Sequence, residues 1–218
     1  MDIYLTQNSY FFVHRHFLRH FERNNSEILY ITENGRGLGK KYLEIIANLG
    51  AWNFLICGIL EVLFFIKLAR RQANLKSIAV TDLELNTRLE GMLKTGNYDR
   101  VISIGAPCLI DATLQKNLGV EILNLHGGIL PVQKGRFSPI KSILKGHKHL
   151  GATLYRIADV FDEGTILSQN SFKMRNKRKL ENYILVLDAA AVLLDDFFEG
   201  KVTAPSQEVL ASLQSGAS

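Results

Sequence analysis

The sequence predicts an α/β fold, namely a Rossmann-like and mostly parallel sheet with helices on both faces. Short β-like apolar runs alternate with longer segments of helical periodicity, the order that parallel sheets require. The composition is 47% hydrophobic and 22% charged, close to the globular average. With 218 residues the chain is long enough to bury a core without disulfides or metal. We expect a single domain over residues 1–218.

Strands and helices alternate through the first two thirds of the chain. Apolar runs predict strands at Ile3–Leu5, Ile28–Ile31, Ser77–Val80, Val101–Ile104 and around Ile122–Leu123. Apolar residues at helical spacing predict helices at Tyr10–Phe21, around Lys40–Asn48, around 52–70 and at Leu83–Leu93. In such folds ligands bind at the carboxyl ends of the strands, so the site is expected in the loops that follow them.

The end of the chain has one further helical pattern. Apolar residues recur at helical spacing from Tyr183 to Leu194, which predicts a C-terminal helix over about 178–200. The tail Gln214–Ser218 is small and polar, and it is expected to fray.

One apolar stretch, Ala51–Ile66, has to be distinguished from a membrane segment. It is shorter than the roughly 20 residues of a typical span, and Glu61 lies in its middle. We therefore expect a helix that is buried in the core or in a homodimer interface, and no membrane contact.

Charge and cysteine content exclude several classes of protein. The two cysteines, Cys57 and Cys108, exclude a disulfide scaffold and fit a reducing compartment. The N-terminus has no signal-peptide pattern, so a cytoplasmic location is expected. The net charge of +5 suits an anionic small molecule at least as well as a nucleic acid, and no block of Lys or Arg dominates.

The predicted strand around 122–123 leads into two chemically useful side chains. Asn124 and His126 are two positions apart, so their side chains leave the same face of the strand. An amide beside an imidazole can stabilise an oxyanion and transfer a proton. Gly127 and Gly128 permit a sharp turn. On these residues alone, a strand that ends in an ordinary turn explains the pattern better.

Three separated motifs change that interpretation. They are N-L-H-G-G-I-L-P from Asn124, G-A-T from Gly151 and F-D-E-G from Phe161. Their order and spacing resemble the formyltransferases that use 10-formyltetrahydrofolate, a family that includes glycinamide ribonucleotide transformylase, methionyl-tRNA formyltransferase and the sugar N-formyltransferases. The resemblance covers about 98–168. The sequence departs from the pattern of this family at three positions: Gly128 stands where serine is usual, Ile129 where leucine is usual, and Ala152 where valine is usual.

The resemblance implies catalytic roles for three residues. Asn124 would donate a hydrogen bond to the oxyanion that forms when an amine attacks the formyl carbon. His126 would stabilise that oxyanion or carry a proton. Asp162 would orient His126 and help to move the proton of the amine, although an aspartate in D-E-G is also a common turn residue. No metal is expected.

The resemblance also implies a flat apolar slot for the folate, formed by loops on two parts of the chain. The implied residues are Ala106, Pro107, Leu109, Ile110, Leu130, Ala158 and Val160. Cys108 would be a small residue of the slot wall rather than a nucleophile, and one of Leu109 and Ile110 could instead belong to the core.

The acceptor site has weaker signals. Lys134 and Arg136 flank Gly135 and could hold a phosphate or carboxylate. The glycine-rich stretch Asn34–Lys41 is either an anion-binding helix N-terminus or a basic loop.

Comparison within the family favours a small-molecule amine as acceptor. Only 48 residues follow position 170, whereas the tRNA-formylating relatives carry a further C-terminal domain. Thr6–Tyr10 lacks the glycines of the phosphate loop in the purine enzymes. We expect a nucleotide-linked amino sugar and no nucleic acid. Alternatives are glycinamide ribonucleotide, hydrolysis of formyltetrahydrofolate, and a relict-fold binding protein without activity.

Overall fold

The computed structural model describes residues 1–7, 13–22, 26–34, 38–72, 75–174, 176–205 and 207–214. These residues pack into two compact units, Met1–Asn124 and Leu125–Ser218, and each unit is described by itself. Three expected features lie outside the described residues, wholly or in part: the start of the helix Tyr10–Phe21, the glycines of the stretch Asn34–Lys41, and the tail. The expectation of a single domain stays a prediction.

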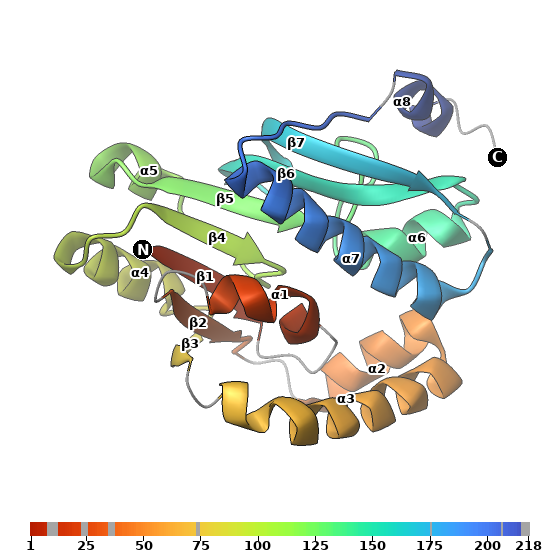
Figure 1. The fold of residues 1–218 in the computed structure, drawn as a ribbon, viewed down its shortest axis with the longest axis horizontal. Helices are drawn as coiled ribbons and strands as arrows, with labels where there is room; N and C mark the ends of the chain where they lie inside the picture. The colour runs from red at the N-terminus through yellow and green to blue at the C-terminus, as the bar shows by residue number, and fades with distance from the viewer. Residues whose placement is uncertain are drawn as a thin grey trace. The chain divides into compact units, whose positions relative to one another are not determined.

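The first unit contains most of the predicted strands and helices (Figure 1). They are β1 (Asp2–Gln7), α1 (Val13–Phe21), β2 (Glu27–Thr32), α2 (Leu38–Leu49), α3 (Ala51–Gln72), β3 (Lys76–Thr81), α4 (Leu85–Thr95), β4 (Arg100–Ile104) and α5 (Thr113–Leu118). The strand β5 (Glu121–His126) leads from this unit into the second. Strand β1 pairs with β2 and β4, and β2 pairs with β3, in each case parallel.

The central strand of this unit is buried on both faces, as a parallel strand covered by helices must be. Ile3, Tyr4 and Leu5 have no exposed surface. Helix α1 turns Phe17 and Phe21 into this core, where the Phe21 ring meets the Tyr4 ring edge to face at 5.2 Å.

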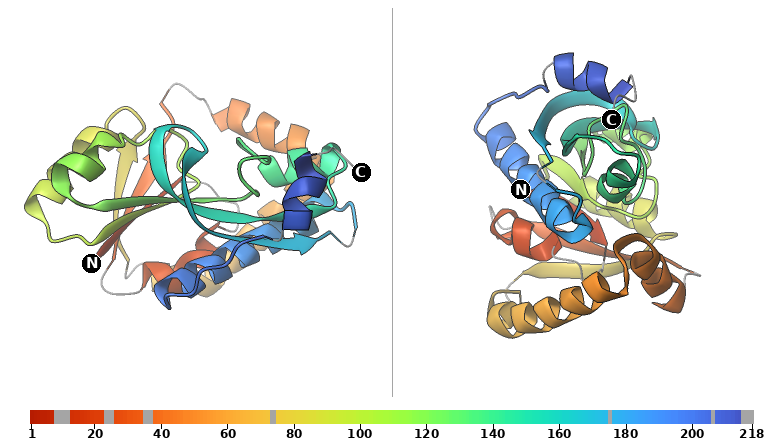
Figure 2. Two further views of the ribbon diagram at one scale, coloured as in Figure 1. Left: turned by 90° about the horizontal axis from the view of Figure 1, so that it is seen from above. Right: turned by 90° about the vertical axis from the view of Figure 1, so that its right-hand side faces the viewer.

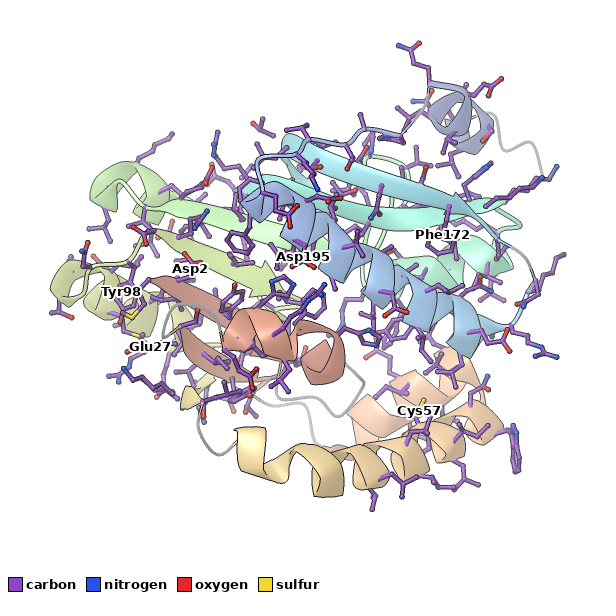
Figure 3. The ribbon with its side chains drawn as sticks, viewed as in Figure 1. Asp2, Glu27, Cys57, Tyr98, Phe172 and Asp195 are labelled. Atoms are coloured by element: carbon purple, nitrogen blue, oxygen red, sulfur yellow. The ribbon has the colours of Figure 1, made fainter. Side chains whose placement is uncertain are left out.

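Helices α2 and α3 lie side by side and are joined through Gly50 (Figure 1). Cys57 lies between them (Figure 3) and is fully buried. The outer face of α3 is apolar and exposed, so the core alone does not bury this helix. Its burial in a homodimer interface stays a prediction. In the described part of the chain no single helix has the length and apolar content to cross a membrane, whereas the bent pair Leu43–Leu49 and Ala51–Leu60 has both.

The second unit is built on a long antiparallel hairpin covered by a helix (Figure 2). Its elements are α6 (Ser138–Leu144), β6 (His149–Val160), β7 (Glu163–Lys173), α7 (Lys179–Phe198) and α8 (Gln207–Gln214). Helix α7 covers the residues whose apolar spacing predicts a C-terminal helix. It packs on β6 through a buried cluster that includes Val186 and Leu150.

The predicted α/β class is confirmed. The described chain has seven strands, and the pairings within the first unit are all parallel, whereas β6 and β7 pair antiparallel. The carboxyl end of β5 and the turn between β6 and β7 carry the residues that the sequence singles out for catalysis.

Candidate active site

The side chains of Asn124 and His126 lie on the same face of strand β5. The two residues are alternate positions of the same strand, and both are partly buried. Their neighbours Leu123 and Leu125 are buried in the core. The apolar alternation of this strand therefore fixes which face carries the amide and the imidazole.

The structure brings His126 into contact with Asp162. The Nδ1 atom of His126 lies 3.2 Å from the Oδ1 atom of Asp162, and each side chain is only 10% exposed. Asp162 occupies the turn between β6 and β7 with φ +54°, a left-handed conformation that aspartate tolerates better than most residues. The two interpretations of this residue are thus compatible: it is a turn residue, and its carboxylate faces the histidine.

The carboxylate of Asp162 is held in place by further donors. The backbone N–H of Gly135 donates to Oδ2 at 2.6 Å, and the hydroxyl of Tyr155 donates to Oδ1 at 3.3 Å. A buried carboxylate with such partners is stabilised in one position, which leaves its direction toward His126 well defined.

The other ring nitrogen of His126 also faces an acceptor. Its Nε2 atom lies 2.7 Å from the backbone carbonyl oxygen of Gln133. A neutral imidazole can donate to only one of its two acceptors, the carbonyl of Gln133 or the carboxylate of Asp162, whereas the imidazolium can donate to both. The ring can therefore take up a proton here without losing either partner, which is the property that a proton-carrying group needs.

Gly128 makes this arrangement possible. A Cβ atom at this position would lie 2.4 Å from the carbonyl oxygen of Gln133 and 2.8 Å from Nε2 of His126. It would also lie 2.6 Å from Oγ of Ser138. The departure from the usual serine of the resembling family thus coincides with the close approach of the Gln133 carbonyl to the histidine.

The loop between β5 and α6 is anchored by buried polar side chains. The hydroxyl of Thr153 donates to the carbonyl of Gly128 at 2.6 Å and accepts from the N–H of Leu130 at 3.1 Å. The amide of Gln169 donates to the carbonyl of Leu130 at 2.8 Å. The Leu130–Pro131 peptide bond is cis. Both backbone groups of Leu130 are therefore satisfied by side chains of the hairpin.

Gln133 closes the same loop from its far end. Its Oε1 atom accepts from the N–H of Ile129 at 3.0 Å, and its Nε2 atom donates to the carbonyl of His149 at 2.8 Å. Sequence reasoning did not single out Gln133, Gln169 or Tyr155, because a lone polar residue outside a motif gives no signal of burial. Thr153 had a signal, since it ends the G-A-T motif.

The residues implied for the folate slot lie in the loop after β4, in the loop between β5 and α6, and at the end of β6. In the first unit, Ala106 and Pro107 are partly buried, Leu109 is 41% exposed and Ile110 is 5% exposed. Ile110 thus belongs to the core, as the sequence allows for one of these two residues. The side chain of Asn86 orders this loop, since it donates to the carbonyl of Leu109 and accepts from the N–H of Asp111.

Cys108, in the same loop, does not have the character of a nucleophile. Burial, together with the negative charges of Asp82 and Glu33, raises the pKa of its thiol to about 11. The thiolate, which is the reactive form, is therefore scarce at neutral pH.

In the second unit the slot candidates differ in exposure. Leu130 is buried at 2% exposure, Ala158 is partly buried, and Val160 is 54% exposed beside the equally exposed Phe161. An apolar pair at the tip of β6, next to the turn that holds Asp162, is a suitable surface for a flat ring system.

The acceptor candidates lie on either side of Gly135. Lys134 forms an ion pair with Glu163 at 2.8 Å, and both side chains are substantially exposed. Arg136 is partly buried. Lys134 is thus already neutralised by a carboxylate that neighbours the Asp162 turn, and an anionic substrate would have to compete with it.

The chain is similar to a formyltetrahydrofolate deformylase and to a sugar formyltransferase. The chain is 30% identical over 77 residues to formyltetrahydrofolate deformylase 2, mitochondrial, of Arabidopsis thaliana. The matched stretch covers 35% of this chain and 23% of that protein. It is 36% identical over 72 residues to dTDP-4-amino-4,6-dideoxyglucose formyltransferase of Mycobacterium bovis. That stretch covers 33% of this chain and 30% of that protein. The chain thus matches less than a third of the length of either relative.

The fold has solved counterparts. Glycinamide ribonucleotide transformylase 1 from Symbiobacterium toebii superposes with a TM-score of 0.62 at 14% identity, over 92% of this chain and 88% of that one. At this identity the likeness establishes the fold. The family model described as formyl transferase matches residues 72–188, which include β5, its loop, and both partners of the His126–Asp162 contact. Since that match covers more than half of the residues, the chain belongs to the formyl transferase family.

Proposed function

We propose that the protein transfers a formyl group from 10-formyltetrahydrofolate to a primary amine of a small molecule. The contact between His126 and Asp162, two residues beyond Asn124 on the same strand, carries this proposal. The family supplies the reaction class.

In this reaction the nitrogen of the acceptor amine attacks the formyl carbon, and the bond between that carbon and N10 of the folate breaks. Negative charge develops on the formyl oxygen, where the Asn124 amide donates a hydrogen bond worth about 3 kcal/mol. The amine loses one proton, and N10 gains one as it leaves. The His126–Asp162 pair can accept the first proton and return it for the second, because the protonated ring donates to both the carboxylate of Asp162 and the carbonyl of Gln133.

The acceptor that we propose is a nucleotide-linked amino sugar. The dTDP-4-amino-4,6-dideoxyglucose formyltransferase of Mycobacterium bovis supports this choice. The lack of glycines in Thr6–Tyr10, where the purine enzymes have a phosphate loop, also favours it over glycinamide ribonucleotide.

Hydrolysis is the second candidate, since the match to formyltetrahydrofolate deformylase 2 favours it. In that reaction water takes the place of the amine, and formate is released. The two reactions need the same oxyanion donor and the same proton carrier, so the acceptor alone distinguishes them.

The test is a transfer assay with purified protein and 10-formyltetrahydrofolate, in which released tetrahydrofolate and formylated product are measured. Acceptors are dTDP-linked 4-amino sugars, glycinamide ribonucleotide, and none. We expect release that depends on the amino sugar and that falls at least about a hundredfold in Asn124→Ala and His126→Ala. Equal release without any acceptor would establish hydrolysis instead, and no release under any condition would leave only the relict-fold binding protein.

A further inference from the structure

One face of α3 exposes large apolar side chains in a continuous stripe. The residues of this stripe are Trp52, Leu55, Ile59, Val62 and Leu63, which are 72%, 52%, 54%, 60% and 59% exposed. Trp52, Leu55 and Ile59 follow one another at spacings of three and four, and Val62 and Leu63 lie three and four positions beyond Ile59, so all five lie on one side of the helix. Single exposed apolar residues are ordinary, whereas a contiguous row of five is typical of a binding surface.

The opposite face of α3 is occupied within the chain. Cys57 is fully buried, and Figure 3 shows it between α2 and α3. The side chain of Asn53 donates to the carbonyl of Leu49 at 2.8 Å, at the end of α2. Gly50, with φ +89°, allows the chain to bend by 111° between the two helices. The stripe therefore points outward because the inner face of the helix is already packed.

The sequence around the stripe is basic at both ends. Residues 38–72 contain five basic side chains and two acidic ones, 5 − 2 = +3 of the net +5 of the whole chain. The basic residues are Lys40 and Lys41 at the start of α2, and Lys67, Arg70 and Arg71 in the last turns of α3. The apolar stripe lies between these two groups in the sequence.

We infer that the outer face of α3 binds to the surface of an anionic lipid bilayer. Apolar side chains flanked by cations are the pattern of helices that lie in the plane of the headgroups, where each basic residue contributes attraction to anionic lipid. Trp52 is the residue type that is enriched at this depth of a membrane. The inference replaces the expectation from the sequence that the helix makes no membrane contact, and it does not depend on the proposed reaction.

A second copy of the chain is a less suitable occupant. A two-fold interface places the same surface on both partners. Residues 38–72 of each copy carry a net charge of +3 in sequence, so such an interface would pair two segments of like charge. Like charges disfavour such a contact, whereas anionic lipid headgroups complement it.

The protein contains its own reporter for the test, since Trp52 is its only tryptophan. Purified full-length protein is sedimented with vesicles of phosphatidylcholine alone, or of phosphatidylcholine and phosphatidylglycerol in equal parts. We expect binding and a blue shift of Trp52 emission with the anionic vesicles, and weaker binding as salt screens the charges. Without anionic lipid, little protein is expected in the pellet.

Two matched variants locate the surface. Ile59→Glu, in the stripe, is expected to lower vesicle binding at least tenfold, while Val192→Glu, on the exposed side of α7, is expected to leave it unchanged. Formyl transfer between soluble substrates is expected to be the same in both variants, so failure here is separate from failure of the proposed function. Equal loss in both variants, or no binding to anionic vesicles, would overturn the inference. A dimer that Ile59→Glu dissociates, without lipid binding, would identify a second copy as the occupant.

Discussion

Nδ1 of His126 lies 3.2 Å from Oδ1 of Asp162, although 36 positions separate the two residues in the sequence. The contact joins the end of β5 to the turn between β6 and β7. Because the N–H of Gly135 and the hydroxyl of Tyr155 hold the carboxylate, it can orient the ring without moving itself. Asp162, which the sequence alone would allow as an ordinary turn residue, therefore has His126 as a fixed electrostatic partner.

Asp162→Asn tests this contact with little change of shape. Asparagine fits the left-handed conformation of the turn and can still accept from Gly135, but it lacks the negative charge that faces Nδ1 of His126. We expect kcat to fall by on the order of a hundredfold, with the melting temperature nearly unchanged. Steady-state kinetics and thermal unfolding measure the two quantities.

Asp159→Asn is the matched control, because it removes an equal charge from an exposed position near the end of the same strand. It is expected to retain full kcat. If Asp162→Asn were as active as this control, the carboxylate would have no part in the proton transfer.

Gly128→Ala tests the carbonyl contact on the other side of the ring. The added Cβ would meet the carbonyl oxygen of Gln133 at 2.4 Å, so one of the two has to move away from His126. Overpacking at such sites costs about 1–3 kcal/mol, and displacement of the ring should lower kcat as well. Thermal unfolding and the histidine ring signals in NMR spectra measure the two effects.

Gly91→Ala provides the contrast for that substitution. Gly91 lies inside α4, and a Cβ there meets nothing within 4 Å. Alanine should stabilise this helix by about 0.5–1 kcal/mol and leave kcat unchanged. A Gly128→Ala protein as stable and active as Gly91→Ala would show that the loop tolerates a side chain.

Cys108 is expected to react slowly with alkylating reagents at neutral pH. Since the pKa of its thiol is raised to about 11, the thiolate fraction at pH 8 is roughly one in a thousand, and the rate should rise about tenfold per pH unit until it levels near pH 11. Peptide mapping after iodoacetamide treatment measures this rate separately from Cys57. Cys108→Ala should retain kcat, whereas fast modification at pH 7 with loss of activity would restore a nucleophilic role.

The sequence predicts the strands of the first unit, and it singles out motifs that lie at the end of β5 and in the turn between β6 and β7. Buried parallel strands are continuous apolar runs, and the chemistry at their carboxyl ends is concentrated in short motifs. Asn124 and His126 could be placed on one face of β5 from strand geometry alone.

The parts that could not be predicted depend on contacts between distant residues. The role of Gln133 arises only because the loop folds back, and the pairing of Lys134 with Glu163 joins residues 29 positions apart. The outward stripe of α3 could not be predicted, because an apolar composition indicates that a helix buries a face but does not say whether its own chain covers every apolar residue.

The ion pair between Lys134 and Glu163 makes the acceptor hypothesis testable in both directions. If Lys134 binds a phosphate of the acceptor, Lys134→Ala should raise the KM of the acceptor about tenfold or more, since a charge-assisted contact contributes about 1.5–3 kcal/mol. The KM of the folate should change little. Glu163→Gln should lower the KM of the acceptor, because Lys134 no longer has to leave a carboxylate at 2.8 Å.

A solely structural ion pair gives a different pattern. Exposed pairs contribute about 0–1 kcal/mol to stability, so both variants would then show nearly unchanged KM values for either substrate and small shifts in melting temperature. Arg136→Ala extends the comparison to the other side of Gly135, with the same expected rise in the KM of the acceptor. The KM of each substrate is measured with that substrate varied in turn. A rise in the KM of the acceptor for Lys134→Ala, together with a fall for Glu163→Gln, is not what a change in stability would cause. It would place the anionic part of the acceptor beside the Asp162 turn.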